Sequence, residues 1–268
     1  MTEETIRMGA STASTLTVDD GMEIAYYEAG ADAAGLPPVL LMHGYIANAE
    51  LNWVLTGVVP ALLAAGRRVV GVDARGHGRS SKPHDPAFYG EGRMAKDLGA
   101  VADMVAPVGF DLVGYSMGAA VSLVLASTDP RVRRLVIGGV GASMVEIGGL
   151  ESRLVTGDEI AEAFLAEDLE EITNPAALAF RTLAEAVGCD REAMAAIARR
   201  RRSTPIDVAQ VAAPTLLLAG KDDPLAVRPQ ILADAMPDGR LQLLEGDHIG
   251  ALADPGFIAS IVGFLAQN

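Results

Sequence analysis

The sequence has one cysteine and four histidines among its 268 residues. Cys189 therefore has no partner for an intramolecular disulfide. A zinc site built from several Cys and His ligands is excluded for the same reason. We expect a protein without a bound metal.

Basic residues are scarce as well. Lys and Arg number 21 against 35 Asp and Glu, which gives a formal net charge of −14. Binding to a nucleic-acid backbone needs clustered Lys and Arg, so no nucleic-acid partner is expected. The one basic run, residues 199–202, lies at the C-terminus of a predicted helix, where cations meet the negative end of the helix dipole. A site for an anionic substrate is the alternative interpretation of this run.

The sequence also lacks a long apolar run. Its longest charge-free stretches, residues 33–49 and 112–128, have 17 residues each, and a bilayer needs about 20 apolar residues. Residues 1–4 carry neither a basic region nor an apolar one, so we expect no secretory signal. These absences favour a soluble, cytoplasmic protein that does not bind a membrane.

What the sequence does contain is a large apolar fraction, since half of its residues are hydrophobic and 21% are charged. Short apolar runs recur along the chain and end in glycine or a polar residue. Continuous apolar runs are typical of strands that are buried on both faces of a parallel sheet. The predicted strands are residues 23–27, 39–42, 68–73, 110–114, 134–137, 215–219 and 240–244.

Helical patterns fill the gaps between these strands. Strands that alternate with helices predict βαβ units with helices on both faces of the sheet. The third helix is apolar nearly all round and should be buried. The predicted helices are residues 53–65, 94–105, 117–127, 228–235 and 255–266.

Residues 142–206 break the alternation, because they show no strand signal. Three helices are predicted there, over 159–172, 176–187 and 191–202, and they begin after Asp158, Asn174 and Asp190. Both flanks of this insert lead to predicted strands. The sequence therefore predicts a core of residues 1–141 and 207–268 with a helical cap formed by residues 142–206.

Residues 114–118 read Gly-Tyr-Ser-Met-Gly and fit the pattern G-x-S-x-G between a predicted strand and a predicted helix. A tight turn there exposes the Ser116 hydroxyl at the top of the sheet and directs the N–H of Met117 to the place where an oxyanion forms. A chance match is the alternative, which the strand–turn–helix context disfavours.

A serine nucleophile needs a base within hydrogen-bond reach. His248 follows the last predicted strand, at the sheet edge where strand ends gather, and a solvated loop histidine is the alternative. His43 ends an early strand, and we expect it to shape a loop in which the N–H of Tyr45 is the second oxyanion donor. His77 and His84 are expected to be structural or surface residues.

The base in turn needs an orienting carboxylate. Asp222 and Asp223 follow the strand 215–219, and we favour Asp223, with Asp222 in the turn. Asp247 precedes His248 directly, but neighbouring side chains rarely face each other. The chain order Ser116, Asp223, His248 is the order of nucleophile, acid and histidine in α/β-hydrolases.

Five features together resemble the α/β-hydrolase superfamily, from about Leu16 to the C-terminus. They are His43-Gly44 after a strand, the run Asp-Ala-Arg-Gly-His-Gly-Arg-Ser at 73–80, the elbow 114–118, residues 220–223, and His248. The resemblance is to the serine-nucleophile, capped, esterase- or lactonase-like branch. It implies a mostly parallel central sheet of about eight strands flanked by helices, with the cap inserted after strand 6.

The resemblance also implies roles for individual residues. Ser116 is similar to the family nucleophile, Asp223 to its acid and His248 to its base. The backbone N–H groups of Tyr45 and Met117 resemble its oxyanion hole. The loop 73–80 resembles a structural turn without direct chemistry. Ala119 stands where many relatives carry a second glycine, which should only tighten packing.

Within this superfamily an elbow aspartate marks haloalkane dehalogenases and epoxide hydrolases, so Ser116 sets both aside. We expect a serine hydrolase that cleaves small to medium carboxylic esters through an acyl-enzyme intermediate, without a cofactor. The alternatives are a cofactor-free perhydrolase or haloperoxidase, or a carbon–carbon bond hydrolase, with the same triad. A non-catalytic ligand-binding protein on the same scaffold is the alternative from another class.

A dinucleotide-binding oxidoreductase is disfavoured, because the glycine-rich runs 76–81 and 139–144 lack the third glycine of G-x-G-x-x-G.

Apolar residues of the cap are candidates for the substrate pocket, because a cap over the crevice excludes water and selects the acyl or alcohol group. Packing of helix on sheet is the alternative for each of them. The predicted pocket residues are Met144, Leu150, Leu154, Phe164 and Phe180, with Ile147, Leu165 and Leu183 as further candidates.

Overall fold

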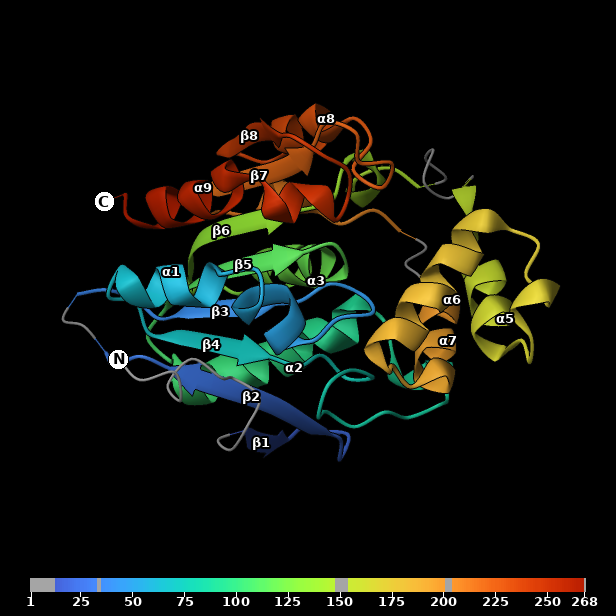
Figure 1. Cartoon of the computed structure of the whole chain (residues 1–268). Helices are drawn as coiled ribbons and strands as arrows, with labels where there is room; N and C mark the ends of the chain where they lie inside the picture. The colour runs from blue at the N-terminus through green and yellow to red at the C-terminus, as the bar shows by residue number, and fades with distance from the viewer. Residues whose placement is uncertain (1–12, 33–34, 148–153, 201–203, 268) are drawn as a thin grey trace.

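The computed structural model describes residues 13–32, 35–147, 154–200 and 204–267. Its centre is an eight-stranded sheet with the strand order β1-β2-β4-β3-β5-β6-β7-β8 (Figure 1). Pairing is parallel from β4 to β8 across the sheet, while β1 and β2 pair antiparallel at one edge. The predicted fold class is confirmed. The strands are β1 (Ser14–Thr17), β2 (Glu23–Ala29), β3 (Val39–Met42), β4 (Val69–Val72), β5 (Phe110–Tyr115), β6 (Val132–Gly138), β7 (Thr215–Gly220) and β8 (Gly239–Leu244).

Helices cover both faces of this sheet (Figure 1). On one face lie α1 (Val58–Ala64) and α9 (Pro255–Leu265), and on the other lie α2 (Glu91–Val105), α3 (Met117–Ala126) and α8 (Pro229–Ala235). Every residue of β3, β4, β5 and β7 is buried, which explains their mostly apolar sequences. The charged exception, Asp111 in β5, is paired with the buried Arg67. Each face has its own apolar core.

Two elements differ from the sequence prediction. The strand β1 was not predicted, because it is mostly exposed and pairs only with β2. The helix predicted over 53–65 is interrupted, since Gly57 has a φ of +89° and α1 begins only at Val58. Residues Glu50–Val54 before it form a short π-helical segment, η2.

The cap helices come between β6 and β7 in the chain and lie beyond the carboxyl ends of the parallel strands (Figure 1). They are α5 (Gly157–Leu165), α6 (Pro175–Val187) and α7 (Arg191–Arg199). Asn174 and Asp190 accept hydrogen bonds from the first turns of α6 and α7, as their predicted capping roles require. The division into core 1–141 with 207–268 and cap 142–206 stays a prediction.

The first cap helix corrects the prediction at both ends. Its N-cap is Thr156, which exchanges hydrogen bonds with Glu159 in a capping box, so Asp158 is not the cap. The helix ends at Leu165, and Leu169–Glu171 form a separate 3₁₀ turn, η5. The α7 helix ends at Arg199, and the end predicted at position 202 lies outside the described residues.

A charged contact ties the cap to the loop that precedes α2. His84 lies 3.2 Å from Asp190 Oδ2 and 2.5 Å from Glu192 Oε2, both at the start of α7. The hydrogen bond with Asp190 is the largest cause of a raised pKa of His84. A histidine with a raised pKa stabilises the fold at pH values below its ordinary pKa of about 6.5, and that stabilisation is lost as the pH rises through the raised value.

We predict that Asp190→Asn lowers the pKa of His84 toward its ordinary value, because asparagine keeps the helix cap but removes the charge. An NMR titration of the four histidine rings measures this. Asp168→Asn, an exposed cap carboxylate, is the control and should leave His84 unchanged. An unchanged His84 titration in Asp190→Asn would contradict the charged contact.

Candidate active site

A strained turn joins β5 to α3 and carries Ser116. This serine has φ +54° and ψ −117°, a backbone conformation that non-glycine residues rarely adopt. Its N–H donates to the carbonyl of Gly138 on β6 at 2.8 Å, which fixes the turn to the sheet. The hydroxyl is thereby presented at the carboxyl end of the strands, in the geometry that G-x-S-x-G predicts.

The glycines of this motif allow the backbone to approach closely. A Cβ at Gly118 would lie 2.1 Å from the carbonyl oxygen of Met42, and one at Gly114 would lie 2.4 Å from the carbonyl oxygen of Gly118. Both obstacles are main-chain atoms, which cannot rotate away. The absence of side chains here lets α3 begin directly over β3 and β5.

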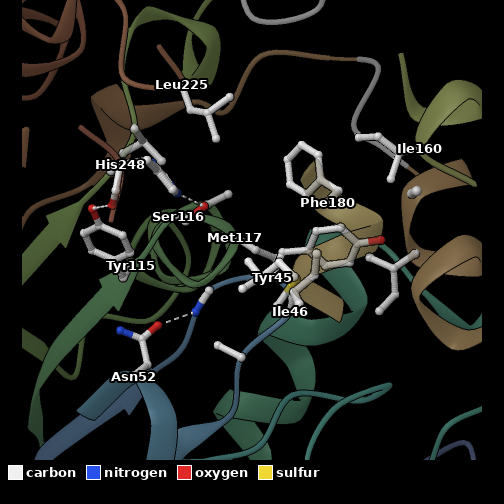
Figure 2. A pocket seen from close by; sticks show the side chains of 18 of the residues that line it. Tyr45, Ile46, Asn52, Tyr115, Ser116, Met117, Ile160, Phe180, Leu225 and His248 are labelled. Atoms are coloured by element: carbon white, nitrogen blue, oxygen red, sulfur yellow. Dashed lines mark hydrogen bonds between the residues drawn. The ribbon is translucent and has the colours of Figure 1, made fainter. Parts of the chain in front are cut away.

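His248 bridges Ser116 and Asp223. Its Nε2 lies 3.0 Å from Ser116 Oγ (Figure 2). Its Nδ1 lies 2.8 Å from Asp223 Oδ2. Asp223 is 6% exposed, and its other oxygen accepts the N–H of Leu225 at 2.8 Å. Because a carboxylate only accepts, Nδ1 carries the proton and Nε2 is left to accept the proton of the serine hydroxyl.

The competing aspartates lie elsewhere. Asp222 and Asp247 are both exposed. The Oδ1 of Asp247 accepts the N–H groups of Ile249 and Gly250, and the bond from Gly250 is the largest cause of its lowered pKa. Asp247 thus closes the turn that carries His248.

His43 orients the loop after β3 that leads to Tyr45. The N–H of Ala74 donates to His43 Nε2 at 2.9 Å, so the ring proton resides on Nδ1, which donates to the carbonyl of Gly44 at 2.7 Å. Complete burial lowers the pKa of His43 and keeps the ring neutral. In a trans peptide the N–H points away from the C=O, so the N–H of Tyr45 points away from His43.

Asp73, from the run 73–80, holds the far end of the same loop. Its carboxylate accepts the N–H of Ala49 at 2.9 Å and the hydroxyl of Tyr27 at 2.7 Å. His77 is buried, with its ring 5.0 Å from that of His43, while His84 is half exposed on the surface. Neither histidine lines the cavity around Ser116.

Two further residues support the site and were missed by sequence reasoning. Asn52 Oδ1 accepts the N–H of Gly44 at 2.8 Å, which holds the loop at a second point besides the bond to His43 (Figure 2). The hydroxyl of Tyr115 donates to the carbonyl of His248 at 2.6 Å, and burial raises the pKa of this tyrosine. Tyr115 lies within the G-x-S-x-G pattern, but the pattern leaves its position free. No local signal marks Asn52.

Two backbone N–H groups close to Ser116 are the candidates for an oxyanion hole. Met117 is the first residue of α3, so its N–H has no acceptor within the helix, and the positive end of the helix dipole lies there. The second is that of Tyr45, on the loop that lies beside Ser116 in Figure 2. A Cβ at Gly44 would be 3.4 Å from the Ser116 Cβ, which shows how close this loop comes.

A cavity of about 940 Å³ opens at Ser116, between the sheet and the cap. Most of its lining is apolar. Its charged lining residues within the described ranges are Glu91, Glu146 and Arg200, besides His248. Glu146 forms an ion pair with Arg228.

The predicted pocket residues divide into three groups. Met144 and Phe180 line the cavity, and the further candidates Ile147 and Leu183 do so as well. Phe164 does not, because it lies on the buried face of α5 in the apolar core of the cap. Leu154 is 47% exposed and outside the lining, as is Leu165 at 43%. Leu150 lies outside the described residues.

Within the described ranges, no group of three or more His, Cys, Asp or Glu side chains is arranged to hold a metal ion. The same part of the chain has no helix that combines the length and the apolarity needed to cross a bilayer.

Comparison with known proteins adds the family. Residues 37–147 match a family model described as the alpha/beta hydrolase fold. The chain is 32% identical over 225 residues to a protein of Variovorax paradoxus named as the proposed carbamate hydrolase RutD, which covers 77% of this chain and 84% of that protein. The chain therefore belongs to the α/β-hydrolase fold family.

Two further relatives extend this comparison. A 2-hydroxy-6-oxo-2,4-heptadienoate hydrolase of Pseudomonas putida is 37% identical over 136 residues, 49% of this chain and 46% of that protein. The matched region thus spans about half the length of several curated relatives. The crystal structure of a hydrolase from Pseudomonas aeruginosa superimposes with a TM-score of 0.78 at 26% identity, over 97% of this chain and all of that one.

We predict that Gly118→Ala destabilises the protein by about 3 kcal/mol, because the new methyl group meets main-chain oxygens and overpacking costs of that order. Chemical denaturation measures this free energy. Gly263→Ala is the matched control: this glycine lies within α9 with open space around it, so alanine should stabilise by about 0.5–1 kcal/mol. Equal effects at the two positions would contradict the tight crossing of α3 and β3.

Proposed function

We propose that the protein is a serine hydrolase that cleaves small to medium, uncharged carboxylic esters through an acyl-enzyme intermediate. Ser116 is the nucleophile, His248 the general base and acid, and Asp223 the orienting carboxylate. The observation that carries the proposal is the pair of hydrogen bonds of 3.0 Å and 2.8 Å that join these side chains through His248.

The steps follow from this arrangement. Ser116 Oγ attacks the ester carbonyl while His248 Nε2 takes its proton, and the carbonyl oxygen becomes an oxyanion between the N–H groups of Tyr45 and Met117. His248 then returns the proton to the departing alcohol. Water, deprotonated by the same imidazole, releases the acyl group as a carboxylic acid. Asp223 stabilises the imidazolium in both halves.

The charges around the cavity favour an uncharged substrate. Two carboxylates and one guanidinium line it within the described ranges, and the whole chain carries a net charge of −14. Because Glu146 is paired with Arg228, the lining itself carries little net charge, and the net charge of the whole chain is the feature that repels an anionic substrate. Hydrolysis of a dienoate, the substrate in the name of the Pseudomonas putida relative, would bring a carboxylate into this cavity. Cleavage of a carbon–carbon bond is for that reason the second candidate.

We predict that Ser116→Ala abolishes hydrolysis of p-nitrophenyl esters, since loss of a triad serine costs on the order of a millionfold in turnover. Release of p-nitrophenol measures the rate. Asp222→Asn is the control, because this exposed aspartate adjoins Asp223 without reaching His248, and it should keep the wild-type rate. A Ser116→Ala variant as active as the wild type would refute the proposal. Absence of turnover in the wild type would favour the carbon–carbon hydrolase, a perhydrolase or a binding protein.

A second prediction concerns the acyl chain. Phe180 faces Ser116 across the cavity (Figure 2), so Phe180→Ala should lengthen the preferred acyl chain in a p-nitrophenyl series from acetate to palmitate. We expect kcat/KM for longer esters, divided by kcat/KM for shorter ones, to rise about 10-fold. A methylene group in an apolar pocket changes kcat/KM by a factor of about this size. Leu165→Ala, at an exposed position outside the cavity, should leave the preference unchanged. An identical profile in both variants would contradict the assignment of Phe180 to the acyl site.

A further inference from the structure

The loop after β3 inserts two consecutive side chains into the cap. The apolar core of the cap is formed by residues between 155 and 198, and the described residues from elsewhere that join it are Tyr45 and Ile46. Both lie against the cap helices in Figure 2. The loop that carries a candidate oxyanion donor is therefore also part of the interior of the cap.

Tyr45 is attached to the cap by its side chain. Its hydroxyl donates to the carbonyl of Met194 on α7 at 2.5 Å. Its ring meets those of Phe164 on α5 and Phe180 on α6 at centroid distances of 6.0 Å and 6.1 Å. One side chain thus contacts α5, α6 and α7.

Ile46 is attached to the cap as well, and its backbone is strained. Its φ is +56°, a value that is unfavourable for a β-branched residue. Its side chain is 3% exposed and packed in the cap core. Strained residues persist only where their surroundings hold them, and this side chain is held by the cap core beside the cavity that it also lines.

We propose that Tyr45 and Ile46 are positioning residues through which the cap holds the oxyanion loop in its working conformation. The core of the protein holds Gly44 at both of its polar backbone groups: His43 bonds to its carbonyl, which belongs to the Gly44–Tyr45 peptide, and Asn52 accepts its N–H. The cap holds the loop beyond Gly44 through Tyr45 and Ile46. This inference rests on the proposed function, because it assigns the N–H of Tyr45 to the oxyanion.

A consequence distinguishes this role from substrate selection. Cap residues that only line the cavity affect ground-state binding and transition-state binding alike, and so change KM. Residues that set the direction of an oxyanion donor act on the transition state, and so change kcat. Misplacement of such a group by about 1 Å costs roughly 100-fold in rate.

The test uses Ile46→Gly and Tyr45→Phe in the full chain with p-nitrophenyl butyrate as substrate. Glycine adopts a φ of +56° without strain but removes the anchor, while phenylalanine removes only the hydroxyl. We expect kcat to fall about 10- to 100-fold in Ile46→Gly and less in Tyr45→Phe, with KM changed by no more than about threefold. Ile46→Val, which keeps a β-branched anchor, should restore most of the rate.

A transition-state analogue supplies the readout that a general loss of cap structure would not produce. Ser116 adds through Oγ to the carbonyl of an alkyl trifluoromethyl ketone, its proton passes to His248, and the ketone oxygen becomes an oxyanion. The affinity for this ketone should fall in parallel with kcat/KM across the variants, while the affinity for the matching secondary alcohol stays constant. Thr182→Ala is the control, because this exposed cap residue donates to the carbonyl of Leu178 within its own helix and does not line the cavity. It should change neither kcat nor ketone affinity.

The outcomes separate the two proposals. Wild-type hydrolysis that does not depend on Ser116 overturns the proposed function itself. Hydrolysis that depends on Ser116, combined with an unchanged kcat in Ile46→Gly and Tyr45→Phe, overturns only the positioning role. A rise in KM without a fall in kcat likewise overturns it, because it would assign both residues to substrate binding.

Discussion

The close crossing of α3 over β3 is the constraint on which the site depends. Because Gly118 has no side chain, α3 can begin this close to β3. A Cβ at this position would collide with the main-chain carbonyl of Met42. That position fixes the turn at Ser116 and the direction of its hydroxyl. The loop after β8 then brings His248 to the Ser116 hydroxyl, and the loop after β7 brings Asp223 to His248. Two hydrogen bonds join the three side chains. A sheet with parallel strands makes this possible, because all the loops involved leave from the same edge.

Burial sets the electrostatics around this point. His43 is fully buried and therefore neutral, which lets it act as a donor at Nδ1 and an acceptor at Nε2 in a fixed tautomer. A charged ring there would place a cation beside the loop after β3 and would lose the bond from Ala74. The neutral histidine thus serves as a rigid connector between two backbone segments. His248, in contrast, is partly exposed and faces the cavity.

Much of the fold could be predicted, because buried parallel strands leave continuous apolar runs and the elbow has a distinctive local pattern. The strand β1 could not, since an exposed edge strand has no such run. The end of α5 at Leu165 was missed because the acidic residues that follow are also good helix formers.

Phe164 and Phe180 look alike in sequence, yet one lies in the cap core and the other lines the cavity. Which face of a cap helix meets the site depends on how the cap sits on the sheet, and periodicity does not encode that. Asn52 and Tyr115 act through single hydrogen bonds to distant backbone atoms, for which no local pattern exists.

The place of the cap in the chain has a consequence for how such proteins diversify. It is inserted between two strands, β6 and β7, that remain paired in continuous parallel register. The sheet does not depend on the insert for its hydrogen bonds, so a cap of other length or shape could be grafted there by recombination without disrupting the scaffold. The loop after β3 works against such free exchange. Its side chains at positions 45 and 46 are fitted to this particular cap, so a foreign cap would need matching residues from a segment a hundred positions earlier. The cap and that loop are therefore expected to change together, although they lie far apart in the chain.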